Sequence, residues 1–129
     1  MLIVSLVAAS LAALLHLYIF VMESFLWTTP RVRATFGITD DVQAEHTKPL
    51  AYNQGFYNLF LAIGGALGIV LMATDAHEAG FAIALFSVGS MLAAALVLVS
   101  TGRSRIRTAS IQGAFPLLAI VFLLISLAV

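Results

Sequence analysis

The chain has 129 residues, of which 62% are hydrophobic and only 9% are charged. A soluble domain carries roughly 25% charged residues, so this chain cannot cover a water-facing surface, and we expect a single-domain integral membrane protein. A formal net charge of zero argues against nucleic-acid binding, and the lack of cysteine excludes disulfides, thiol catalysis and cysteine-ligated metal clusters.

Four stretches are long and apolar enough to cross a bilayer, which takes about 20 mostly apolar residues. They are Leu2–Trp27, Leu50–Ala73, Gly80–Ser100 and Thr108–Val129. The first lacks the basic flank and the small-residue cleavage site of a signal peptide, so we expect it to be retained. The predicted fold class is all-α, an integral membrane four-helix bundle.

The segment between the first two stretches shows signals of short helices at the membrane interface. Thr29 followed by Pro30 is typical of a helix start, and Gly37 of a helix end. A second short helix is predicted to begin at Thr39–Asp41 and to run towards Pro49, at the head of the second span. Trp27 is expected in the aromatic belt at the same interface.

Basic residues indicate the orientation of the four spans. All six Lys and Arg residues follow either the first or the third span: Arg31, Arg33, Lys48, Arg103, Arg105 and Arg107. These two linkers lie on the same side of the membrane, and the positive-inside rule makes that side cytoplasmic. We therefore predict that both termini lie outside.

Glu23 is the most informative residue, because it lies within an apolar span. An acidic side chain near the centre of a spanning helix costs about 2.5–3.5 kcal/mol unless it is paired. His16 lies two turns earlier on the same face, about 10.5 Å away along the helix axis, so the two side chains can flank a ligand but not readily bond each other. Intramembrane ionisable residues mark candidate functional sites.

Other polar side chains are predicted to lie close to Glu23. Four of them lie at the start of the second span: Asn53, Gln54, Tyr57 and Asn58. Helical geometry at 100° per residue places these four within an arc of about 140° around the helix axis. Most of the set lies within about 10 Å of the cytoplasmic interface, with His16 and Asn58 deeper. We predict a ligand-binding pocket that narrows towards His16 and is formed by Glu23, His16, Asn53, Gln54, Tyr57, Asn58 and Gln112.

A purely structural role is the alternative for each of these residues. Polar side chains also hold membrane helices together, for about 0.6–2 kcal/mol each. Glu23 could pair with Arg31, Arg33 or Lys48 and serve no further purpose. Small residues in the second and third spans favour close helix packing, either within the bundle or in a homo-oligomer. Pro116 is expected to kink the fourth span and to free a backbone carbonyl near Gln112.

Two motifs give the chain a family resemblance over nearly its whole length. The first combines His16-Leu17-Tyr18-Ile19 with Glu23-Ser24-Phe25-Leu26-Trp27, and the second is Asn53-Gln54-Gly55-Phe56-Tyr57-Asn58. They resemble H-x-Y-I-x-x-x-E-M-F-L-W-T-T-P and N-Q-G-x-Y-N of the small bacterial four-span membrane proteins grouped as domain of unknown function 1304, except that Ser24 replaces a common methionine. The resemblance implies the fold and a multi-pass place in the bacterial cytoplasmic (inner) membrane. It implies no activity, and the sequence leaves any cofactor unknown.

Binding of a small amphipathic or lipid-like molecule is the function that the sequence favours. An apolar bundle with a few converging polar groups is the usual composition of a small-molecule site. A proton-coupled transporter is an alternative, since a buried carboxylate can exchange a proton for a cation. Against transport, Glu23 lies off-centre and the outer half of the spans is almost free of strong polar groups, so it offers no polar path.

Two further alternatives concern chemistry and assembly. Glu23 and His16 could form the acid/base pair of an intramembrane enzyme, although the sequence contains no nucleophile motif, phosphate loop or dinucleotide fingerprint. A metal site of His16, Glu23 and His46 lacks the usual ligand spacing, so no metal is predicted. The chain could also be an accessory subunit of a larger membrane complex.

Overall fold

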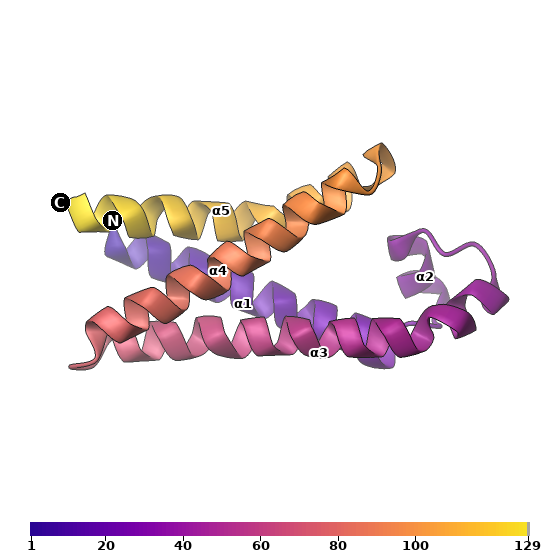
Figure 1. Ribbon diagram of the computed structural model, residues 1–129, viewed down its shortest axis with the longest axis horizontal. Coiled ribbons are helices and arrows are strands. Elements are labelled where there is room, and N and C mark those ends of the chain that lie inside the picture. The colour runs from indigo at the N-terminus through magenta and orange to yellow at the C-terminus, as the bar shows by residue number, and fades with distance from the viewer. Residues whose placement is uncertain (129) are drawn as a thin grey trace.

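The computed structural model describes residues 1–128 and shows four long helices and one short one (Figure 1). The long helices are α1 (Leu2–Phe25), α3 (Asp41–Met72), α4 (His77–Ser100) and α5 (Ile106–Ala128), and each is long and apolar enough to cross a membrane. The short helix α2 (Pro30–Phe36) precedes α3, and a 3-10 turn, η1 (Arg103–Arg105), precedes α5. The predicted all-α class is confirmed.

The helices pack in the cyclic order α1, α3, α4, α5. Each long helix contacts its two neighbours extensively, whereas α1 and α4 barely touch across the bundle. Successive long helices run in opposite directions, as in an up-and-down bundle. Figure 1 shows the N-terminus, the α3–α4 turn and the C-terminal part of α5 at one end, here named the terminal end, and α2 with η1 at the other, named the linker end.

The hydrophobic core lies towards the terminal end and consists mainly of small side chains. Ala9 and Ala12 of α1 meet Val88 of α4 and Leu123 of α5, all with almost no exposure; the same cluster contains Ala8, Met72, Ala84, Met91 and Ala119. Small residues let helix backbones approach closely, which increases the dispersion contacts that hold membrane helices together.

Glycines mark the closest approaches between helices. A Cβ atom added at Gly68 of α3 would lie 2.5 Å from the backbone nitrogen of Ala84 in α4. Gly65 of α3 faces Ala13 of α1 in the same half of the bundle. In Figure 1, α4 then diverges from α3 towards the linker end and approaches α5.

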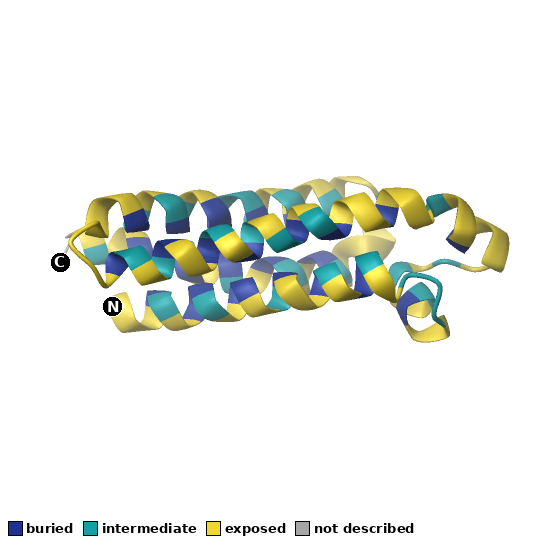
Figure 2. Ribbon diagram, turned by 90° about the horizontal axis from the view of Figure 1, so that it is seen from below, coloured by how far each residue is buried: buried dark blue, intermediate teal, exposed yellow. Residues whose placement is uncertain are grey.

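Large apolar side chains cover the outside of the bundle. Figure 2 shows exposed residues along the outer faces of the helices and buried ones along the inner faces. Leu14, Phe60, Phe86 and Leu124 are examples, one from each long helix. Because water would not tolerate so much exposed apolar surface, these faces are suited to contact with lipid.

Helix α2 begins and ends where the sequence signals lie and folds back against α1. Pro30 is its first residue, and Gly37 follows it in the left-handed conformation (φ 71°). Val32 of α2 is buried against Ile19 and Met22 of α1. Thr29 occupies the N-cap position, but its hydroxyl donates to the Leu26 carbonyl instead of capping α2.

The start of α3 differs from the sequence expectation. No separate short helix precedes the second span, because α3 begins at Asp41, capped by the Asp40 carboxylate, and continues through Pro49. Proline removes one intrahelical hydrogen bond. Two contacts compensate by holding the segment before Pro49: Trp27 Nε1 donates to Thr47 Oγ1, and Arg33 pairs with Asp41.

Candidate functional site

A cavity of about 890 Å³ opens between the helices at the linker end. One wall comes from α1 and α3 and the other from α4 and α5, while α2 and η1 contribute residues nearer the linkers. Much of its lining is apolar and includes Leu15, Ile19, Met22, Ala94, Val97, Leu98 and Ile111. The cavity thus occupies the half of the bundle that the small-residue core does not fill.

Glu23 and Asn58 form the polar centre of the α1–α3 wall. Asn58 Nδ2 donates to Glu23 Oε2 at 2.7 Å, and both side chains are buried, with 8% and 4% exposure, yet both line the cavity. Asn58 Nδ2 also lies 3.3 Å from the Gln54 carbonyl oxygen one turn earlier in α3. Among the described residues, no other hydrogen bond reaches the Glu23 carboxyl group.

Glu23 forms no ion pair with a basic residue among residues 1–128, so the purely structural pairing considered from the sequence is not present there. Arg33 pairs with Asp41 and Lys48 pairs with Glu45. Arg31 lines the same cavity as Glu23 without forming an ion pair with it. The buried carboxyl group therefore depends on one neutral amide, which is weaker compensation than a cation would provide.

Gln54 and Gln112 bring two further amide side chains to the cavity, from α3 and α5 respectively. Pro116 lies inside α5, fully buried, and cannot donate the backbone hydrogen bond that the Gln112 carbonyl would otherwise accept.

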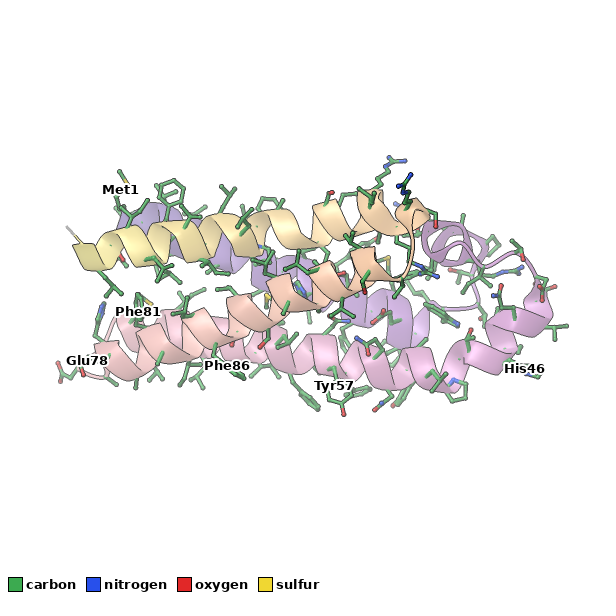
Figure 3. The ribbon with its side chains drawn as sticks, turned by 45° about the horizontal axis from the view of Figure 1, so that its top comes forward. Met1, His46, Tyr57, Glu78, Phe81 and Phe86 are labelled. Carbon is green, nitrogen blue, oxygen red and sulfur yellow. The ribbon has the colours of Figure 1, made fainter. Side chains whose placement is uncertain are left out.

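Asn53 and Tyr57 do not reach the cavity, although the sequence placed them with Gln54 and Asn58. Both are exposed, and Figure 3 shows Tyr57 pointing away from the bundle. Residues four apart share a helix face, so Gln54 and Asn58 form one stripe, while Asn53 and Tyr57 form the neighbouring one. Only the first stripe faces α4 and α5 across the cavity.

His16 is fully buried but does not line the cavity. Its Nδ1 lies 2.9 Å from the Ala12 carbonyl oxygen, which can only accept, so Nδ1 carries the hydrogen. Nε2 is buried and has no hydrogen-bond partner among residues 1–128. His46 is exposed at the linker end (Figure 3), and no group of three or more His, Asp or Glu side chains within the described chain could hold a metal ion.

Several lining residues escaped the sequence analysis. Trp27 was expected to serve as a membrane-interface anchor, but it lines the cavity, packs on Phe36 and bonds Thr47. Arg31 was interpreted as an orientation signal and a possible partner of Glu23, and Arg105 only as an orientation signal, yet both line the cavity. Nothing in their spacing distinguishes them from the other basic residues, because the chain reversals that bring α2 and η1 to the cavity are not encoded in a local pattern.

Four helices long and apolar enough to span a membrane, with a mainly apolar cavity at one end that contains a few polar groups, define a small multi-pass membrane protein. Residues 10–124 match a family model, and this range includes every cavity-lining residue. The chain belongs to that family, described as protein of unknown function (DUF1304), which confirms the resemblance seen in the sequence motifs. Neither the curated proteins nor the solved structures contain a match to this chain.

Proposed function

We propose that this protein binds a small amphipathic molecule, such as a quinone, isoprenoid, lipid or hydrophobic xenobiotic, in the cavity at the linker end. One observation carries the proposal: the buried Glu23–Asn58 pair faces a cavity that is otherwise mainly apolar. Sites for small molecules combine an apolar lining with a few placed polar groups and measure about 300–1,000 Å³. The volume of about 890 Å³ falls within this range.

The Glu23 carboxyl group is the anchor that we propose for the polar part of the ligand. Asn58 bonds Oε2 only, so Oε1 can accept a hydrogen bond from a ligand hydroxyl or amine. Gln54 and Gln112 would add hydrogen bonds from two sides. Asn53 and Tyr57 are not included, because they are exposed and do not line the cavity.

Packing at the terminal end supports binding over transport. A transported solute would have to pass the cluster of Ala9, Ala12, Val88, Met91 and Leu123, whose side chains are almost completely buried against one another. The position of His16 likewise favours binding over acid/base catalysis, since a group outside the cavity lining does not flank a substrate held there. On the orientation predicted from the basic residues, the cavity would open towards the cytoplasm.

Two neighbouring residues of α3 provide the test. Gln54 lines the cavity and Asn53 does not, so Gln54→Ala and Asn53→Ala make matched variants of the full chain. Native mass spectrometry of protein extracted in a mild detergent would measure the copurified small molecule. We expect an adduct on the wild type and on Asn53→Ala, and at least several-fold lower occupancy on Gln54→Ala and Glu23→Ala.

Equal occupancy in all four proteins would contradict the proposal. So would the lack of any adduct, if added amphipaths also failed to bind saturably. Thermal unfolding of each variant serves as the control, because a loss of occupancy counts only for protein that remains folded.

A further inference from the structure

Two arginines reach the cavity from segments that are far apart in the sequence. Arg31 belongs to α2 and Arg105 to η1, and both line the cavity. Neither has a carboxylate within ion-pair distance among residues 1–128, whereas Arg33 and Lys48 each have one. Two exposed basic side chains without an ion pair in the described part of the chain therefore border the linker end of the cavity.

Membrane orientation explains why basic residues are present in these linkers but not which of them face the cavity. Arg103 and Arg107 flank Arg105 in the sequence and do not line the cavity. A guanidinium group presents a planar fork of donors that matches phosphate oxygens, and two forks from separate segments can hold one such group from two sides. The placement thus fits an anionic head group.

The rest of the lining fits a hydrocarbon chain. From the linker end inward, α4 contributes Leu98, Val97 and Ala94, and α5 contributes Ile111. The volume of about 890 Å³ suits one drug-sized molecule. The cavity is therefore cationic near the linkers, apolar along its length, and hydrogen-bonding at the Glu23–Asn58 pair.

Building on the proposed function, we infer that the ligand is a single-chain amphipath with a phosphate-type head. Arg31 and Arg105 bind the phosphate, Glu23 accepts a hydrogen bond from a hydroxyl or amine of the same polar head, and the chain extends inward along the apolar lining past Ile19 and Leu15 of α1. The inference names the class of ligand for the site proposed above, and it fails if the head group makes no difference to binding.

Trp27 provides the measurement, because it is the only tryptophan in the chain and it lines the cavity. The full chain is placed in phosphatidylcholine nanodiscs and titrated with 2-bromododecyl phosphate, whose bromine lies next to the head group and quenches a tryptophan that it contacts. Competition with unbrominated dodecyl phosphate, dodecanol, dodecyltrimethylammonium or inorganic phosphate then reports the preferred head. We expect saturable quenching that dodecyl phosphate reverses at a concentration at least tenfold lower than any other competitor.

A matched pair of double variants separates the cavity from general surface charge. Arg31→Gln with Arg105→Gln removes the two lining charges, and Arg103→Gln with Arg107→Gln removes the same number of charges from outside the lining. The first variant should bind the brominated phosphate at least tenfold more weakly, while the affinity for dodecanol stays unchanged. The second variant should bind both like the wild type.

The possible failures are distinguishable. If dodecanol competes as well as dodecyl phosphate, or if both double variants weaken binding equally, the phosphate-type head is wrong and amphipath binding stands. If inorganic phosphate competes as well as dodecyl phosphate, the site binds free phosphate and the chain plays no part. If no amphipath reverses the quenching, the inference and the proposed function both fail.

Discussion

At the scale of single residues, the Glu23–Asn58 hydrogen bond is the feature on which the site depends. The two residues lie on different helices, and each has few alternatives: Glu23 has no cation partner within the described chain, and the second contact of Asn58 is the longer one, to the Gln54 carbonyl. Leaving one member of a buried polar pair alone costs more than removing both, because the remaining group keeps its desolvation penalty.

Replacing Asn58 by leucine should therefore lower the free energy of unfolding by about 1–3 kcal/mol. Glu23→Leu combined with Asn58→Leu should recover most of that loss, while abolishing ligand binding. Reversible unfolding in mixed detergent micelles measures both effects. Tyr57→Leu, one residue away and exposed, is the control and should change stability by less than about 0.5 kcal/mol. A double variant as unstable as the sum of its single variants would contradict the pairing.

The sequence predicted part of this residue-scale picture. Depth and helix faces were enough to group Glu23 with Gln54, Asn58 and Gln112, which line one cavity. They were not enough to exclude Asn53, because an arc of about 140° is wider than the face that one helix presents to a cavity. The ligand-binding role of the whole set stays a prediction.

At the scale of helices, glycine positions fix how closely α3 and α4 can pack. Gly68 has the Ala84 backbone against it, whereas Gly89 has open space where a side chain would begin. Both lie inside helices, where changing glycine to alanine ordinarily gains about 1 kcal/mol from reduced backbone freedom. Because Gly68 and Gly89 have different surroundings, the same change to alanine should affect the stability of the protein differently at the two positions.

Gly89→Ala should raise the unfolding temperature, since the new methyl group meets nothing within 4 Å. Gly68→Ala should lower it, because the methyl group can fit only if α4 moves away from α3, and such overpacking costs about 1–3 kcal/mol. Thermal denaturation of the two variants side by side measures the contrast. A gain for both would show that the α3–α4 contact is looser than described here.

Pro49 shows why helix boundaries were harder to predict than helices. The sequence indicates a break before the second span, because proline removes a hydrogen bond and clashes with the preceding turn. Helix α3 nevertheless continues, held by the Trp27–Thr47 hydrogen bond and the Arg33–Asp41 pair. Both are contacts between distant segments, which local patterns do not contain.

At the scale of the whole molecule, the number and class of the spanning helices followed directly from the apolar stretches, since lipid forces backbone polar groups into helices. Their cyclic order did not, because neighbouring apolar faces have similar compositions and no local signal selects a partner. The chain reversals that bring Arg31 and Arg105 to the cavity were missed for the same reason.

The orientation in the membrane stays a prediction that cysteine labelling can test. The chain has no cysteine of its own, so single replacements report their own position. Asp75→Cys lies in the α3–α4 turn and Thr39→Cys in the α2–α3 linker, and both positions are exposed. With the basic linkers inside, a membrane-impermeant maleimide should label Asp75→Cys in intact cells and Thr39→Cys only after permeabilisation. The reverse labelling pattern would show that the basic linkers, and with them the mouth of the cavity, face the outside of the cell.

The contact between Gly68 and Ala84 also gives the bundle a mechanical property. Since α3 and α4 touch there and diverge towards the linker end, a tilt of one helix against the other would have this contact as its fulcrum. Gln54 lies fourteen residues along α3, or roughly 21 Å at 1.5 Å per residue, so a rotation of about 3° at the fulcrum displaces it by about 1 Å. Bilayers of different thickness change helix tilt by such angles. A membrane whose thickness tilted α3 against α4 by that angle would therefore change the width of the cavity mouth by about 1 Å.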